Sequence, residues 1–171
     1  MSILNPRPYE RLPARRAVPC DWPADLADFY ATHEGVGLES TFERSVRLCR
    51  LDEVQRVTVA DMQHFCGDDP AWASFAGFLI GSSPYLDQVV YALSAPVCLR
   101  GTIMAFGYDL AGPGGQGEAA CEPSLVLAET FADWLARLEQ FNGDELGFRP
   151  GAIEDPAQRA YFRRLNPAIA W

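Results

Sequence analysis

The spacing of apolar residues changes along the chain, from a helical period near the start to a strand period in the middle. Leu26, Phe29 and Tyr30 recur at helical spacing after Pro23, a residue that suits the first turn of a helix. Gly35 follows as a helix-ending residue. The pattern predicts a helix of about ten residues that buries these three side chains.

Between residues 75 and 108 the apolar positions follow the shorter period of β-strands. The strand candidates there are 78–80, 88–93, 97–100 and 102–108. Turn residues such as Gly81, Pro96 and Gly101 separate them, and connections this short favour an antiparallel meander. Upstream, residues 46–51 alternate apolar and polar positions and predict a half-buried strand.

Two pairs of residues have the spacing of a capping box at a helix start. Thr58 and Asp61 form the first pair, and residues 51–66 are accordingly predicted to be helical in two pieces. Thr130 and Asp133 form the second pair. They follow a short strand at 125–127 and open a helix with one apolar stripe: Phe131, Trp134, Leu135, Leu138 and Phe141.

A last helix is predicted after Pro156, where Tyr161, Phe162 and Leu165 recur at helical spacing. The predicted fold class is therefore α+β, with a mostly antiparallel sheet of four to six strands packed by N-terminal and C-terminal helices. Residues 1–21 are rich in Pro and Arg and predict an extended arm over the domain. Residues 22–171 are expected to form a single domain, and the stretch Gly112–Gly117 a loop.

The net charge of -9 bears on the class of partner. It disfavours nucleic acid and anionic membranes, which proteins bind through Lys and Arg. A basic protein partner is compatible with it, and so is a simple solubility charge. The acidity is uneven: residues 21–69 hold eleven acids against four arginines, whereas the first twenty hold four arginines against Glu10 alone.

The chain has five cysteines without a close pair, which predicts reduced side chains and no zinc site. The one local cluster of metal-ligand types, Asp61, His64, Cys66, Asp68 and Asp69, matches no common zinc spacing and is interpreted as a solvent-facing helix end. The start of the chain lacks the apolar core of a secretory signal, and no run of apolar residues predicts a membrane span. A cytoplasmic location is expected.

No pattern predicts an enzyme or a bound cofactor. Ser82 and Ser83 follow Gly81, but the Gly-x-Ser-x-Gly turn of hydrolases is missing. The glycines of 112–117 lack the Lys-Ser/Thr pair of a phosphate-binding loop. These residues are interpreted as turn and loop residues.

Three short segments occur together in a recognisable order. They are 22–37 (WPADLADFYATHEGVG), 78–93 (FLIGSSPYLDQVVYAL) and 125–141 (LVLAETFADWLARLEQF). In this order they resemble the SUKH superfamily, the Smi/Knr-type proteins, over about residues 22–141. The resemblance implies an α+β fold and, for the bacterial members, an immunity protein that binds and silences a toxin. It also leaves open an intracellular scaffold or regulator, as in the fungal regulators of cell-wall synthesis.

The resemblance and the charge together predict a cognate toxin protein, such as a cationic nuclease, as the partner. The contact residues expected from this reasoning are surface acids together with one aromatic anchor. They are Glu34, Glu39, Glu43, Asp68, Asp69, Asp87 and Trp72.

Overall fold

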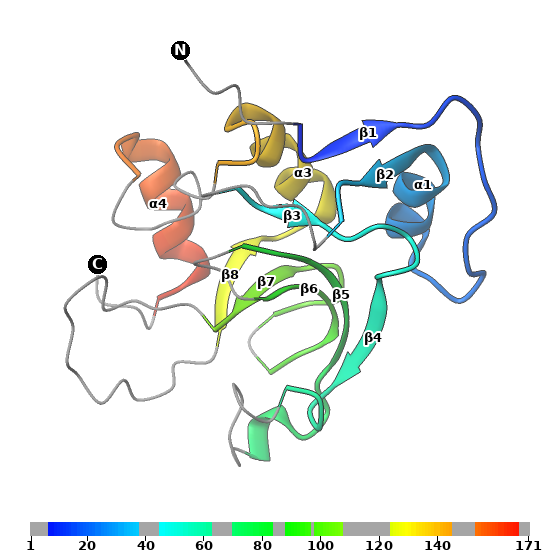
Figure 1. The fold of residues 1–171 in the computed structure, drawn as a ribbon. Coiled ribbons are helices and arrows are strands. Elements are labelled where there is room, and N and C mark those ends of the chain that lie inside the picture. Colours follow the sequence, from blue (N-terminus) through cyan, green and yellow to red (C-terminus); the bar gives the residue numbers. More distant parts are fainter. Residues whose placement is uncertain are drawn as a thin grey trace.

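The structure, a computed structural model, describes residues 7–37, 45–62, 70–83, 88–96, 98–107, 124–144 and 153–167. These residues form a curved six-stranded sheet, a separate two-stranded sheet and the α-helices α1, α3 and α4 (Figure 1). All strand pairings are antiparallel. The predicted α+β class is confirmed.

The main sheet has the strand order β3-β5-β6-β7-β8, and β4 also pairs with β5. Strands β5, β6 and β7 pair in chain order, which confirms the predicted antiparallel meander except for its strand at 97–100, and β8 continues the same order. The strands are β3 (Arg47–Leu48), β4 (Gln55–Thr58), β5 (Ala76–Ser82), β6 (Gln88–Ser94), β7 (Ile103–Phe106) and β8 (Ser124–Ala128).

Both faces of the sheet are buried. On β6, Val89 and Tyr91 belong to one apolar cluster, whereas Val90 and Ala92 belong to a second, because successive strand residues point to opposite faces. The first cluster includes side chains of all three helices. The second is completed by residues of β4 and of the short 3-10 helix η1 (Pro70–Trp72).

The helices begin where the sequence predicts. Helix α1 (Ala24–Thr32) follows Pro23 and buries its predicted apolar face. Helix α3 (Phe131–Gln140) is capped by Thr130, whose Oγ1 accepts a hydrogen bond of 3.1 Å from the Asp133 amide. Helix α4 (Pro156–Leu165) is capped by Asp155, whose carboxylate accepts from the Ala157 amide.

The segment predicted as an arm contributes a strand. Strand β1 (Tyr9–Arg11) pairs with β2 (His33–Gly35), which follows α1 directly. The backbone amide of Arg16 also donates to the Ala31 carbonyl (2.9 Å). The described part of the arm is therefore held against α1 and β2.

Two local predictions are wrong. The described part of 51–66 contains β4 instead of two helical pieces, because Val57 is buried in the second cluster while its backbone pairs with β5. Asp61 still accepts hydrogen bonds from the Thr58 amide and hydroxyl, but they close a turn. Around the predicted strand 97–100 the structure has only an isolated bridge between Ala95 and Cys98, with Val97 itself outside the described residues. The Gly112–Gly117 stretch also lies outside them.

Candidate functional site

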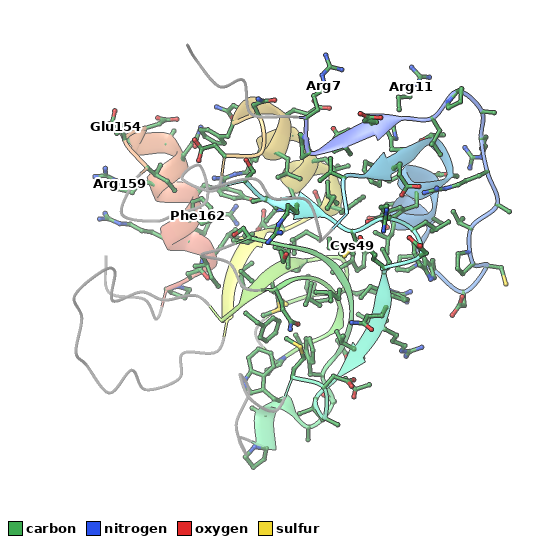
Figure 2. All side chains as sticks on the ribbon, in the orientation of Figure 1. Arg7, Arg11, Cys49, Glu154, Arg159 and Phe162 are labelled. Carbon is green, nitrogen blue, oxygen red and sulfur yellow. The ribbon has the colours of Figure 1, made fainter. Side chains whose placement is uncertain are left out.

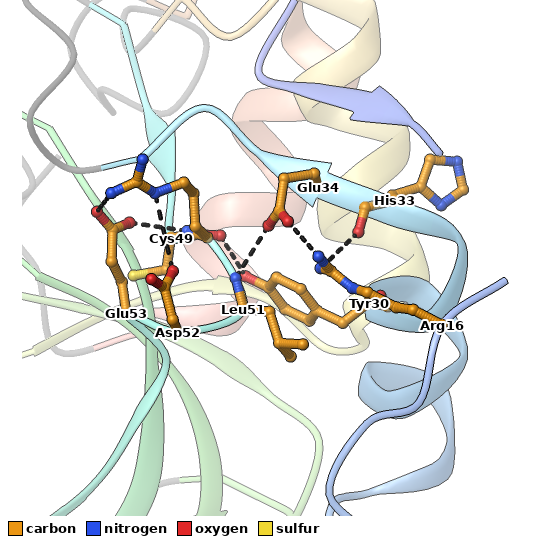
Figure 3. Close-up of polar contacts among 9 residues, drawn as sticks. Arg16, Tyr30, His33, Glu34, Cys49, Leu51, Asp52 and Glu53 are labelled. Carbon is orange, nitrogen blue, oxygen red and sulfur yellow. Dashed lines mark hydrogen bonds and ion pairs between the residues drawn. The ribbon is translucent and has the colours of Figure 1, made fainter. Parts of the chain in front are cut away.

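Glu34 of β2 lies at the centre of a cluster of charged side chains. Its carboxylate forms an ion pair with Arg16 from the arm and accepts a hydrogen bond of 2.9 Å from the Leu51 amide (Figure 3). Burial alone would raise the pKa of Glu34, but these hydrogen bonds and the charge of Arg16 lower it below the ordinary value of 4.5. The carboxylate is therefore ionised at neutral pH.

Arg16 is fixed by more than this ion pair. Its Nε donates to the Tyr30 carbonyl (2.9 Å) and its Nη2 to the His33 carbonyl (3.1 Å). The hydrogen bond to Glu34 raises the pKa of Arg16. A guanidinium with carbonyl acceptors and a carboxylate around it is held in one orientation.

A second ion pair lies beside the first, in the turn after β3. Arg50 is 3.8 Å from the Asp52 carboxylate and 3.4 Å from that of Glu53. The Asp52 side chain is 81% exposed and that of Glu53 only 18%. Asp52 is therefore the carboxylate of this group that a partner can reach.

These groups line a hollow of about 480 Å³, here called the Glu34 hollow, which is formed by Arg16, Glu34, Arg50, Leu51 and Asp52. With Glu53 beside it, the cluster holds two arginines against three carboxylates. The cluster is thus slightly acidic and pre-ordered, which suits the docking of a partner's cationic side chain.

The backbone next to the hollow is closely packed. The buried Tyr30 hydroxyl donates to the Cys49 carbonyl (2.9 Å). Gly35 packs so closely that a Cβ there would lie 2.0 Å from the same oxygen. Burial raises the pKa of the Cys49 thiol to about 12, so it stays protonated and is a poor nucleophile.

The structure places the predicted contact residues as follows. Glu34 is half-buried and ion-paired instead of fully exposed. The prediction that Trp72 is an exposed anchor is wrong: it is 5% exposed and packs against Phe75 and Phe106 in the second apolar cluster. Helix η1, which carries Trp72, lies at the far end of the sheet from β2 (Figure 1). The other predicted contacts, Glu39, Glu43, Asp68, Asp69 and Asp87, lie outside the described residues.

Sequence reasoning missed Arg16, Arg50 and Asp52 as members of this site. The signal for the first was present, because an arginine-rich arm precedes an acid-rich stretch and opposite charges attract. Nothing in the local pattern indicates that the arm returns to β2, which is a long-range contact.

Comparisons with protein-family models, with curated proteins and with solved structures find no match to this chain. Within the described ranges, no three His, Cys, Asp or Glu side chains are grouped so that they could hold a metal ion. No helix in the same ranges is long and apolar enough to cross a membrane.

Proposed function

We propose that this chain is an immunity protein that binds a cognate bacterial toxin and neutralises it by stoichiometric protein-protein binding. The target chemistry that fits best is a cationic toxin, such as a nuclease whose substrate groove is basic. An acidic protein that covers such a groove blocks substrate phosphates and associates quickly through electrostatic steering.

The observation that carries the proposal is that the three segments with the SUKH resemblance pack against one another. Trp22 contacts Phe78, with ring centroids 5.4 Å apart, and joins the first segment to the second. The Tyr91 hydroxyl donates to the Asp25 carboxylate (2.9 Å) across the same boundary. The first two segments of the resemblance therefore belong to one core.

The third segment completes this core from α3. The ring centroid of Phe131 lies 5.4 Å from that of Phe29 in the first segment and 6.0 Å from that of Tyr91 in the second. Both pairs make edge-to-face contacts. Its neighbour Trp134 is fully buried in the same apolar cluster. The three segments that carry the resemblance therefore meet at one set of aromatic side chains.

The acidic net charge of the chain supports a cationic partner. The chain carries 23 acidic against 14 basic residues. In the Glu34 hollow, Asp52 is exposed beside carboxylates that are already ordered by arginines. We propose that a basic side chain of the toxin enters this hollow and that Glu39, Glu43, Asp68, Asp69 and Asp87 extend the acidic contact surface.

The experiment looks for a toxin gene beside the gene of this chain, pairs the chain with that toxin, and measures protection and binding kinetics. The test variant carries Glu43→Lys with Asp52→Lys. The matched control carries Asp133→Lys with Glu154→Lys, the same change in net charge at exposed positions of α3 and before α4 (Figure 2 labels Glu154). Circular dichroism checks that both variants are folded.

The test variant should associate more slowly at low salt by roughly tenfold, and its rate should depend less on salt, because steering comes from charges at the interface. The association rate of the control variant should fall far less. An equal fall in the association rate of both variants would show that net charge alone, and not the Glu34 hollow, controls association. The absence of any complex with the neighbouring toxin would contradict the proposed function itself.

A further inference from the structure

A second hollow, of about 510 Å³, lies between β1 and the C-terminal end of α3. We call it the Arg7 hollow; its lining residues are Arg7, Pro8, Tyr9, Arg11, His33, Glu139 and Asn142. Its volume falls in the range of small-molecule sites. The acidic contact surface proposed above does not include it.

The period of a β-strand explains why cations gather here. Alternate strand residues point to the same side, so Tyr9 and Arg11 share one face of β1, whereas Glu10 belongs to the other. Arg7 lies just before the strand and lines the same hollow. Figure 2 shows Arg7 and Arg11 projecting to the same side of β1. His33 pairs directly with Arg11 across the two-stranded sheet and joins the same face.

The one carboxylate among the described lining residues of the hollow is already engaged. Glu139 accepts a hydrogen bond from the Tyr9 hydroxyl. Burial raises the pKa of Tyr9, and this bond raises it further, so the hydroxyl keeps its proton. Among the described residues, Arg7 and Arg11 have no carboxylate in an ion pair with them. Both arginines are exposed, and no described carboxylate is paired with either of them.

The carbonyl groups at the C-terminal end of α3 carry partial negative charge, which opposes the positive charge of Arg7 and Arg11. This opposition is weaker than at a helix end whose carbonyls are free. The carbonyls of Arg137, Leu138 and Glu139 accept hydrogen bonds from the amides of Phe141, Gly143 and Asn142. These bonds occupy acceptors that an uncapped C-terminus would present to the hollow.

We propose that the Arg7 hollow binds a small phosphorylated molecule, with Arg7 and Arg11 holding its phosphate oxygens. Guanidinium groups match phosphate geometry with paired N–H donors, and the two arginines outnumber the Glu139 carboxylate, so the described lining favours an anion. The remaining volume, beside Pro8 and the Tyr9 ring, accommodates the rest of the molecule. This proposal does not depend on the toxin-binding function.

Isothermal titration of the full chain with pyrophosphate, adenosine diphosphate and succinate tests the proposal. Pyrophosphate tests the phosphate group alone, the nucleotide adds an organic part, and succinate is a carboxylate of lower charge. The variant is Arg7→Gln with Arg11→Gln. The control is Arg159→Gln with Arg163→Gln on α4, which removes the same charge outside the hollow. Circular dichroism confirms folding of each.

Saturable binding of a phosphate probe should weaken roughly tenfold or more in the Arg7/Arg11 variant and little in the control. Glu139→Gln should tighten binding, because it removes a negative charge while keeping an oxygen for Tyr9. Tighter binding of the nucleotide than of pyrophosphate would identify an organic phosphate as the ligand, and the reverse an inorganic one. No saturable phosphate binding, succinate binding as tightly, or equal loss in the control would overturn the proposal.

Discussion

At the residue scale, Glu34 joins three segments through its two carboxylate oxygens. One oxygen pairs with Arg16 of the arm, the other accepts from the Leu51 amide, and the residue itself belongs to β2. The side chains of Glu34 and Arg16 are both 27% exposed, so water screens the pair less than it screens a fully exposed one. This interaction therefore contributes to folding as well as to the shape of the Glu34 hollow.

Glu34→Gln should lower the free energy of unfolding by about 1 kcal/mol at neutral pH, since a charge-assisted bond becomes a neutral one. The folded-state pKa of Glu34 is lowered, so its stabilisation is full above the ordinary value of 4.5 and is lost as the pH falls through the folded value. Urea unfolding at a series of pH values measures this. The difference between wild type and variant should shrink with acidification.

The control for this measurement is Glu154→Gln, because Glu154 is exposed and lies away from the Glu34 hollow. It should change stability little at any pH. A difference between wild type and Glu34→Gln that is constant with pH would contradict the role assigned to the ionised carboxylate.

At the element scale, the side chain of Asn166, just after α4, holds that helix against the edge of the sheet. It bonds to the backbone N–H and C=O of one β8 residue, as a neighbouring strand would. The buried Asn166 amide accepts from the Val126 backbone N–H (2.7 Å) and donates to the Val126 carbonyl (2.9 Å). Arg164 adds an ion pair with Glu129. Because β8 is the last strand of the sheet, these contacts satisfy backbone groups that an open edge would expose.

Asn166→Ala should destabilise the protein by about 1 to 3 kcal/mol, because it leaves buried backbone groups of Val126 without their partner. Thermal unfolding measures the loss, and hydrogen exchange at the Val126 amide should become faster. Arg163→Ala, an exposed change on α4, is the control. Unchanged exchange at Val126 would show that the amide contact does not hold α4 to β8.

Helix α3 allows a matched comparison on one face. Leu138 is fully buried, whereas Leu135 is only half-buried, so the central position of the stripe is not Leu135. Leu138→Ala should cost about 2 to 5 kcal/mol, as deletion of core side chains does. Leu135→Ala should cost clearly less. Urea unfolding of the two variants checks this, and an equal loss would mean that the burial of the helix face is described wrongly.

Elements with local signals were predictable and elements that depend on distant partners were not. The Thr130 cap, the apolar face of α1 and the β5–β6 hairpin can be read from neighbouring residues. Strand β4 could not, because its four residues are too few to show a period and their conformation comes from pairing with β5. The Thr58/Asp61 spacing was read as a helix start, but the same hydrogen bonds close a turn.

In the candidate site, too, features with a local signal were predictable and those that depend on distant residues were not. The acid-rich stretch after α1 was visible in the sequence, and it does carry the Glu34 hollow. Its neutralising partner Arg16 comes from the arm, and only the folded chain brings the two together. The prediction that Trp72 is an exposed anchor fails because β7 supplies Phe106 as a packing partner, a long-range contact without a local signal in the sequence.

At the scale of the whole molecule, charge is divided between two hollows. The Glu34 hollow is slightly acidic within a chain of net charge -9, whereas the Arg7 hollow has two arginines against one carboxylate. The two lie on different parts of the β1–β2 and α1 unit, with Arg16 and Glu34 lining one and Arg11 and His33 lining the other. The described residues that line the two hollows are therefore different.

The central claim is neutralisation by stoichiometric binding. The most direct measurement titrates the proposed cognate toxin with the purified protein and follows residual toxin activity. We expect activity to fall linearly and to end at a fixed stoichiometric ratio, with full activity regained when the complex is dissociated. Complete loss of toxin activity at far less than one equivalent would mean turnover, and undiminished activity at excess protein would mean that the toxin is not its partner; either result would contradict the account.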